Sequence, residues 1–149
     1  MSRIDVMDEA IIDADPSTVF KALIEELRGV TSWWKLHLES TPRDKEKFGR
    51  KGSVFDITVH RVGTPKFTAR ITEIIEGKLL NVEYIEGDFL GNGEWSFEPI
   101  DGKTKVRFRW NVVIKRPLYR VLGSYVVGKA HSGVMQQGLK EMNRYLTQK

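Results

Sequence analysis

The fold is decided by the stretch NGEWSFEPIDGKTKVRFRWNVVIK, residues 92–115, and by the segment that follows it. Apolar and polar residues alternate on both sides of the turn Pro99-Ile-Asp-Gly102, which predicts two antiparallel strands, Gly93–Glu98 and Lys103–Lys115. Within Leu118–Thr147 the apolar residues change to helical spacing, which predicts one long amphipathic helix. A sheet with one helix closing over it is a natural container for an apolar small molecule.

The terminal helix has one apolar side. Over residues 127–146, apolar side chains fall on one half of the helical wheel and most polar ones on the other. His131 projects from the middle of the apolar half, and Gly138, also on the inward side, leaves room beneath the helix. Residues 118–126 follow a different phase. We therefore expect either a bend near Gly128 or a separate short cap before the main helix.

The N-terminal part of the chain predicts a strand followed by helical structure. Ile4–Ala14 alternates well enough for a strand. Asp15 is a good N-cap, and Pro16 suits the first helical position, where its missing N–H would have no partner anyway. Apolar residues then recur at helical spacing up to Gly29, which is a stop signal. A second short helical turn is expected at residues 31–36.

The middle of the chain predicts a loop and more strands. Residues 39–52 are polar and rich in turn-forming residues, so we expect a loop there. Alternation predicts strands at Ser53–Arg61, Phe67–Ile75 and Leu79–Glu86. Strands joined by short turns, each with one polar face, indicate an antiparallel sheet. The expected fold is therefore α+β, with a curved antiparallel sheet of about six strands, two short helices after the first strand and a long C-terminal helix. We expect one domain over residues 1–149.

Charge is distributed unevenly along the chain. The formal net charge is +4, yet residues 102–149 hold eleven Lys and Arg against a single acid, Glu141. Such a split can indicate a basic face for phosphate groups or anionic lipid. The basic residues between 103 and 109 alternate strictly with Thr104, Val106 and Phe108, however. We therefore interpret them as the solvent side of a strand and expect no nucleic-acid partner.

Composition gives a default location. The sequence has no cysteine, so disulfides, thiolate metal sites and thiol nucleophiles are excluded. No apolar run is long enough to cross a bilayer, and the first residues, MSRID, lack the apolar stretch of a secretory signal. We expect a cytoplasmic protein without a transmembrane segment. Peripheral contact with a membrane and the oligomeric state stay open.

Three familiar kinds of site are missing from the sequence. His37, His60 and His131 lack the spacing of a metal site, so we expect no metal and no cofactor. Gly91-Asn-Gly93 begins like a dinucleotide loop but leads into a strand without a third glycine. No Gly-x-Ser-x-Gly motif of a serine hydrolase occurs. The sequence therefore predicts no known catalytic constellation.

His131 and the tryptophans are the sharpest candidates for a site. A histidine desolvated on an apolar helix face is neutral near pH 7. His131 either meets a ligand in a pocket or is a core histidine bonded to a backbone or tyrosine oxygen. Of Trp33 and Trp34, one lines an opening if the segment is extended, or both pin a loop. Trp95 and Trp110 lie on apolar strand faces, and they become pocket wall only where the helix stands away from the sheet.

Three stretches of the chain carry a resemblance to a known family. They are IIDADPSTVF (residues 11–20), Ser32-Trp-Trp34, and the late hairpin and helix, with GEWSFEPIDG at 93–102, VRFRW at 106–110 and His131-x-x-Val-Met135-x-x-Gly138. With these, the chain resembles the START/Bet v 1-like (SRPBCC) superfamily, in its polyketide cyclase/dehydrase-like branch, over essentially its whole length. The resemblance implies a helix-grip fold with an apolar cavity between a curved sheet and the C-terminal helix. Members bind lipids, sterols or polyketides and some are cyclases or hydrolases, but no catalytic pattern carries over to particular positions here.

The leading hypothesis is binding or transport of a small hydrophobic ligand, such as a lipid or polyketide, between sheet and helix. One alternative is an enzyme of the cyclase, dehydratase or hydrolase kind, with His131 as general base and Tyr84 as donor in the same cavity. Another is an interaction module without a ligand that uses the basic sheet face or residues 118–126. The residues expected to line the ligand site are Trp33, Trp34, Phe55, Tyr84, Trp95, Phe108, Trp110, His131 and Met135.

Overall fold

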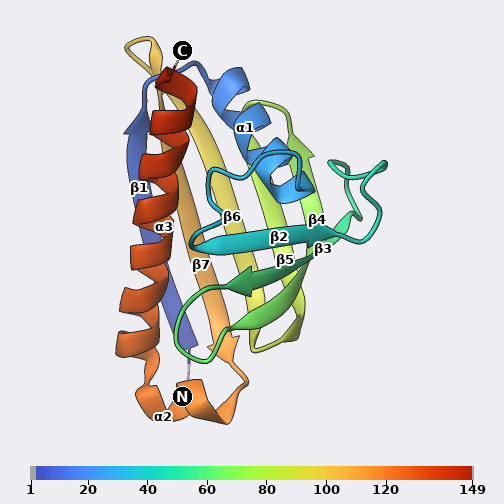
Figure 1. Cartoon of the computed structure of the whole chain (residues 1–149), viewed down its shortest axis with the longest axis vertical. Helices are drawn as coiled ribbons and strands as arrows, with labels where there is room; N and C mark the ends of the chain where they lie inside the picture. Colours follow the sequence, from blue (N-terminus) through green and yellow to red (C-terminus); the bar gives the residue numbers. More distant parts are fainter. Residues whose placement is uncertain (1–2, 149) are drawn as a thin grey trace.

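The computed structural model describes residues 3–148 and shows a curled antiparallel sheet with a long helix along it (Figure 1). Within these residues the sheet has seven strands in the order β1-β7-β6-β5-β4-β3-β2, so β1 and β2 are its edges. The strands are β1 (Arg3–Ile12), β2 (Leu38–Pro42), β3 (Val54–Val59), β4 (Lys66–Ile75), β5 (Leu79–Gly87), β6 (Phe89–Ile100) and β7 (Lys103–Ile114). The helices are α1 (Pro16–Arg28), α2 (Pro117–Leu122) and α3 (Ser124–Thr147). The expected α+β helix-grip architecture is confirmed.

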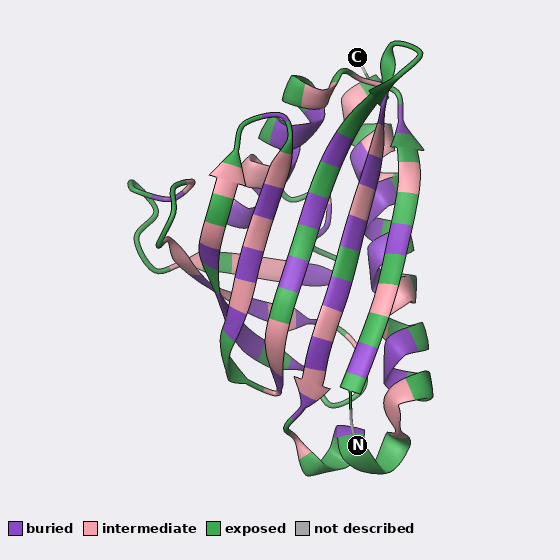
Figure 2. Ribbon diagram, turned by 180° about the vertical axis from the view of Figure 1, so that it is seen from behind, coloured by how far each residue is buried: buried purple, intermediate pink, exposed green. Residues whose placement is uncertain are grey.

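The late hairpin forms where the sequence predicts it and is longer than expected. β6 and β7 pair from Phe89 opposite Ile114 to Ile100 opposite Lys103. Figure 2 shows buried and exposed residues alternating along these strands. β7 also pairs with β1, so the start and the end of the sheet-forming chain are neighbours. The hairpin therefore supplies one continuous apolar surface to the interior.

The basic side chains of β7 lie on the solvent face, as the alternation predicts. Arg109 forms an ion pair with Asp5 at 2.7 Å, and Arg107 forms one with Glu9 at 2.9 Å. The hydrogen bond from Arg109 holds the pKa of Asp5 below its ordinary value. Acidic residues of β1 therefore neutralise much of the positive charge of β7, and this face is not a free basic surface.

The composition of residues 39–52 predicts a loop, but residues 39–42 belong to the strand β2. This strand pairs with β3 from Leu38 opposite Val59 to Pro42 opposite Phe55. Its burial pattern contains only one fully buried residue, Leu38. A short edge strand can carry polar residues and even proline because one side of its backbone has no ladder partner. Its sequence therefore looks like a loop.

The second helix expected after the first strand does not form, and residues 31–36 make turns instead. The reason is Glu26, a buried carboxylate on α1. It accepts hydrogen bonds from the backbone N–H groups of Trp33 at 3.1 Å and Trp34 at 2.9 Å, and from the Thr31 hydroxyl at 2.6 Å. These N–H groups bond to a side chain rather than to the carbonyls of a helical turn. One helix, α1, follows β1.

The ends of α1 agree with their sequence signals. Asp15 is the N-cap, and its carboxylate accepts a hydrogen bond from the Thr18 backbone N–H at 3.4 Å. Pro16 occupies the first helical position. Gly29 ends the helix with φ 85°, a left-handed conformation in which glycine pays no Cβ penalty.

Irregular pairing bends the sheet around its interior. The register between β4 and β5 shifts between Thr68 and Ala69 and again between Ile71 and Glu73. An extra residue on one strand increases the local twist and bends that strand. The sheet therefore curls from one edge to the other, with α3 lying along β1 (Figure 1).

α3 is fastened to β1 by a polar contact and by a close approach. Asp8 is buried and accepts hydrogen bonds from the Ser132 hydroxyl at 3.1 Å and the Gln136 amide at 3.2 Å. Gly128 faces the same strand, because a Cβ placed there would lie 3.5 Å from the Ile4 side chain.

Within residues 3–148, no helix is long and apolar enough to cross a membrane.

A second close approach joins α3 to the turn after α1. The Trp34 indole lies against Gly138, where a Cβ would overlap its ring, and its Nε1 donates to the Val134 backbone oxygen at 3.3 Å. The sequence-based expectation that Gly138 faces inward is confirmed by this contact. Any side chain at position 138 would occupy the space in which the indole ring packs against the helix.

A separate short helix, α2, precedes α3, which agrees with one of the two expected alternatives. The break lies at Gly123 and not at Gly128, and its φ of 89° and ψ of 157° suit glycine. α2 packs under the β3–β4 loop, where the Tyr119 hydroxyl donates to the Val62 backbone oxygen at 2.7 Å. The phase change seen in the sequence is therefore a change of helix.

Replacing Gly138 with alanine should destabilise the protein by about 1–3 kcal/mol, because the new methyl group overpacks against Trp34. The matched control is Gly133→Ala, on an exposed part of the same helix with no atom within 4 Å of the added Cβ. It should raise the free energy of unfolding by up to about 1 kcal/mol. Urea unfolding measures both changes. Equal effects of the two substitutions would contradict the close approach.

Candidate ligand-binding cavity

A cavity of about 320 Å³ lies between the concave face of the sheet and α3. Its wall is formed by side chains from strands β2 to β7, from each of the three helices, from the turn after α1 and from the β3–β4 loop. Its volume is at the lower end of the roughly 300–1,000 Å³ that small-molecule pockets occupy. Most of the wall is apolar. Among the described wall residues, the ionisable side chains are Arg61, Tyr84, Tyr119 and His131.

All but one of the residues expected at the ligand site line this cavity. Trp33 does not, since it is half-buried behind Trp34, with the two rings stacked 5.6 Å apart at 8°. The residues that the fold brings together around the cavity are Trp34, Phe55, Tyr84, Trp95, Phe108, Trp110, His131 and Met135. Their contact with a ligand remains a prediction.

Aromatic rings support one another in the wall. Trp95 and Phe108 have centroids 4.4 Å apart, and the rings of Phe89 and Trp110 meet at 4.9 Å and 65°. Such pairs stabilise packing by about 0.5–1.5 kcal/mol beyond the apolar area that they bury. The wall opposite α3 is therefore formed before any ligand arrives.

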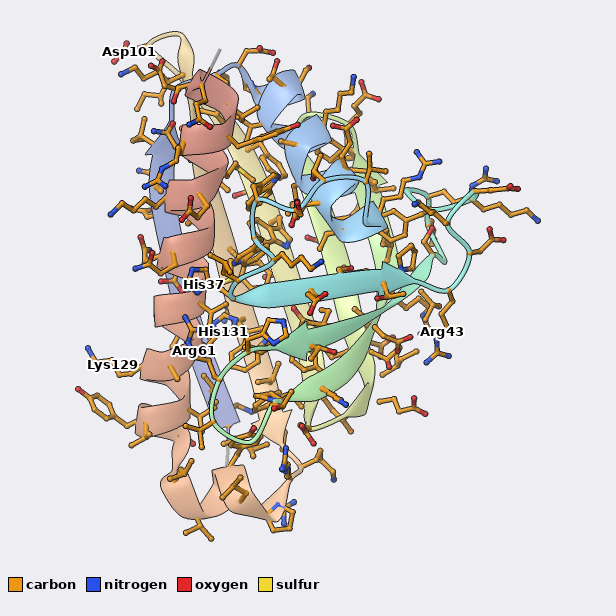
Figure 3. The ribbon with its side chains drawn as sticks, viewed as in Figure 1. His37, Arg43, Arg61, Asp101, Lys129 and His131 are labelled. Carbon is orange, nitrogen blue, oxygen red and sulfur yellow. The ribbon has the colours of Figure 1, made fainter. Side chains whose placement is uncertain are left out.

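His131 points from α3 toward the sheet (Figure 3) and lies flat on Trp110, with centroids 3.7 Å apart and planes at 1°. Its Nδ1 is buried and has no hydrogen-bond partner among the described residues. Burial lowers the pKa of His131 from 6.5 to about 3, so the ring is neutral near pH 7. The position is therefore a cavity wall, not that of a core histidine bonded to an oxygen through Nδ1.

Gly93 on β6 makes room for the hydroxyl group of Tyr84 on β5. A Cβ at position 93 would lie 2.5 Å from this oxygen and 3.0 Å from the Phe108 ring. Burial raises the pKa of Tyr84, and the neighbouring Trp110 indole opposes this rise. Trp110 Nε1 lies near this hydroxyl but forms no hydrogen bond with any described residue. Because burial raises its pKa, the Tyr84 side chain is a neutral phenol near pH 7.

Sequence reasoning missed the wall residues of the β3–β4 loop, Arg61, Val62 and Pro65. Arg61 donates to the His60 backbone oxygen at 2.8 Å and to His37 Nδ1 at 3.0 Å. Arg61 lines the same cavity as His131, and both are labelled in Figure 3. The only sequence signal for these residues is an arginine beside a turn, a pattern too common to single out.

Residues 118–126, which the sequence left as a possible cap, form the rim of the cavity. Tyr119, Leu122 and Val126 belong to the wall. Leu122 and Val126 are also exposed to solvent, as is Val62 from the β3–β4 loop. Side chains that face both the cavity and the solvent lie where a cavity opens. The mouth is therefore between the α2–α3 junction and the β3–β4 loop.

Polar groups of β2, β3 and the residues that directly follow them pair with one another outside the cavity. His60 Nε2 lies 2.6 Å from Glu39 Oε2, and Arg43 lies 3.0 Å from Asp56. The hydrogen bond from Arg43 holds the pKa of Asp56 below its ordinary value. Over residues 3–148, no group of three or more His, Asp or Glu side chains is arranged to hold a metal ion.

The model of one protein family, described as polyketide cyclase/dehydrase and lipid transport, matches residues 3–147. The chain belongs to this family. The description joins two activities, so membership supports an apolar ligand or cyclase chemistry without selecting a ligand. No curated protein matches the sequence closely enough to count as a relative.

Solved structures share the architecture of this family member. Ara h 8.0201 is 18% identical with a TM-score of 0.71, and the alignment covers 99% of each chain. The protein TTHA0849 from Thermus thermophilus is 21% identical with a TM-score of 0.75 and 94% of each chain covered. The Zhui aromatase/cyclase from Streptomyces sp. R1128 is 14% identical with a TM-score of 0.71, covering 98% of this chain and 97% of its own. At these identities the likeness establishes the fold alone.

Replacing Glu26 with alanine should destabilise the protein by about 2–3 kcal/mol, because two backbone N–H groups and a hydroxyl lose a charged acceptor. Glu25→Ala, on the same helix but only half-buried, should change the free energy of unfolding by less than about 0.5 kcal/mol. Thermal and urea unfolding measure both. Similar losses in the two variants would mean that Glu26 does not hold the Trp33-Trp34 turn.

Proposed function

We propose that the protein binds or transports a small hydrophobic ligand in the cavity between the sheet and α3. The observation that carries this proposal is an apolar cavity of about 320 Å³ with an opening to solvent. Covering such a wall with ligand stabilises a complex by about 25 cal/mol per Å² of apolar surface removed from water. Family membership supports the same class of function, because its description includes lipid transport.

The few polar groups of the wall favour a ligand with an uncharged polar group at its inner end. Nδ1 of His131 is enclosed, so Nε2 is the nitrogen through which this ring can meet a ligand. Tyr84 offers a hydroxyl that stays protonated, because burial raises its pKa. A neutral imidazole and a neutral phenol offer no charge to balance a buried carboxylate, and the cationic Arg61 of the wall belongs to the β3–β4 loop beside the mouth. A hydroxyl or carbonyl group satisfies them better.

Catalysis with His131 as general base is the alternative function, and its electrostatics disfavour it. An efficient general base has a pKa near the working pH. The pKa of His131 is lowered by burial to about 3, so the ring is a weak base at neutral pH. Binding without proton transfer through His131 therefore fits the site better.

Closing the mouth should abolish binding. Ala130 lies on the cavity wall and is exposed, so Ala130→Trp places an indole in the opening. We expect the affinity for the uncharged fluorescent probe N-phenyl-1-naphthylamine to fall about tenfold or more in this variant. Gln137→Trp adds the same side chain at an exposed position of α3 outside the cavity wall and should bind as the original protein does.

Native mass spectrometry tests the same proposal without a probe. The purified protein should carry a co-purifying apolar molecule, and Ala130→Trp should lose it. If no such molecule is found and the probe binds equally well to Ala130→Trp, the cavity is not a ligand site.

Replacing His131 with phenylalanine should make stability less sensitive to acid. The folded-state pKa of about 3 lies below the ordinary 6.5, so the unfolded chain binds more protons than the folded one between these values. The original protein should therefore lose stability as the pH falls from about 6.5 toward 3, and His131→Phe should lose less. Urea unfolding at several pH values measures the difference. Parallel pH profiles of the two proteins would contradict the buried, neutral histidine.

A further inference from the structure

Large apolar side chains are exposed together around the mouth of the cavity. Val121 on α2 is 85% exposed, Tyr125 on α3 is 76% exposed, and Val62 in the β3–β4 loop is 75% exposed. Scattered exposed apolar residues are ordinary, but a contiguous group on a monomer indicates an interaction site. We call this group the mouth patch. It consists of Val62, Leu118, Val121, Leu122, Tyr125 and Val126.

The mouth patch is continuous because its segments pack on one another. The Tyr119 hydroxyl of α2 donates to the backbone oxygen of Val62 at 2.7 Å. Leu118 lies beside Gly63 in the same loop, where an added Cβ would be 2.9 Å from the leucine methyl group. Only Gly123 separates α2 from α3. Loop and helices therefore present one surface.

This surface runs directly into the cavity. Val62, Leu122 and Val126 are members of the mouth patch and also line the wall. An apolar molecule can therefore pass from a phase that touches the patch into the cavity along apolar side chains only. The mouth patch and the cavity wall therefore form one connected apolar surface.

Three exposed bases lie beside the mouth patch, and an acid of the same region, Asp88, is already paired with Arg116 at 3.4 Å. Lys115, Arg120 and Lys129 are exposed and form no ion pair with any residue between 3 and 148. The sequence has no Asp or Glu between Asp101 and Glu141, so neighbours in the chain offer none. This differs from the outer face of β7, where arginines pair with acids of β1. The positive charge near the mouth is therefore available to an external partner.

We propose that the mouth patch and the basic residues beside it dock on the surface of an anionic lipid bilayer. Valine and leucine side chains gain free energy by entering the boundary between headgroups and acyl chains, and tyrosine is favoured at that depth. Lysine and arginine at the edge contact lipid phosphates. A bilayer matches the three properties of this surface together, since it offers apolar phase, negative charge and a source of hydrophobic molecules at the cavity mouth.

Docking through this surface presents one end of the molecule to the bilayer. α2 and the first turns of α3 lie at that end, largely exposed (Figure 2), while the β6–β7 turn with Asp101 lies at the other (Figure 3). The paired charges on the outer face of β1 and β7 run between the two ends. The β6–β7 turn therefore provides matched control positions away from the docking surface.

Flotation with lipid vesicles tests the proposal. The protein should bind vesicles of phosphatidylcholine mixed with phosphatidylglycerol and bind phosphatidylcholine vesicles more weakly. Raising the NaCl concentration from about 0.05 M to about 0.5 M should weaken the binding, because the screening length shortens. No binding to the anionic vesicles at the lower salt concentration would overturn the proposal.

Two variants test the apolar side chains and the basic residues of the docking surface. Val121→Asp and the double variant Arg120→Gln with Lys129→Gln should each reduce binding to anionic vesicles about tenfold or more. Ile100→Asp and the double variant Lys103→Gln with Lys140→Gln make matched changes at or toward the opposite end, where all three residues are exposed, and should bind as the original protein does. Equal losses in the control variants would overturn the proposal.

The same variants keep docking separate from ligand binding. Val121, Arg120 and Lys129 lie outside the cavity wall, so their substitution should leave the affinity for the uncharged probe N-phenyl-1-naphthylamine unchanged. Loss of vesicle binding with full probe binding supports docking, whatever the cavity holds. If sedimentation instead shows a dimer that Val121→Asp dissociates, and vesicles do not compete with it, the patch binds a second copy and the proposal fails.

Discussion

The packing of Trp34 against Gly138 is the contact on which the rest of the structure depends. A second glycine, Gly128, brings α3 close to β1 ten residues earlier. Between these two approaches the helix spans the concave sheet, and its inward side chains, among them His131 and Met135, face a cavity. One side of the helix is held on β1, where Asp8 binds Ser132 and Gln136, and Gly138 lets the helix pack directly on Trp34. Glu26 stabilises this arrangement by holding the turn that carries Trp34.

Charge is divided among three regions of the molecule. On the outer sheet, basic side chains of β7 pair with acids of β1, so they add little net field. Inside the cavity, His131 and Tyr84 remain neutral because charging a group there costs desolvation. At the mouth, by contrast, exposed bases have no ion-pair partner among the described residues. The end where the apolar interior is accessible therefore carries positive charge that no described acid pairs.

Much of the fold could be predicted because its signals are periodic. Alternation located the late hairpin, and the helical wheel gave the direction of His131 and Gly138 correctly. The edge strand β2 could not be found this way, since only Leu38 in it is fully buried. The sequence predicts a helical turn at 31–36, but the Glu26 side chain of the preceding helix binds the backbone of this segment instead. Both errors concern structure that is set by tertiary contacts.

The residues of the candidate site could also be predicted in part from the sequence. Aromatic residues on strand faces could be assigned to the interior, and most of them line the cavity. Arg61 and Val62 could not, because a turn has no repeat and only its packing over α2 brings it to the mouth. His131 Nδ1 has no hydrogen-bond partner among the described residues, and a sequence cannot predict this because it depends on the positions of all neighbouring atoms.

The placement of the tryptophans gives the protein a spectroscopic property of its own. The chain has four, and three of them, Trp34, Trp95 and Trp110, border the cavity while Trp33 stacks on Trp34. Indole emission shifts in wavelength and intensity with the polarity and mobility of its surroundings. Every intrinsic fluorophore of this class is thus at the cavity or one ring away from it. The ultraviolet emission of the unlabelled protein therefore reports on the cavity contents without an added dye.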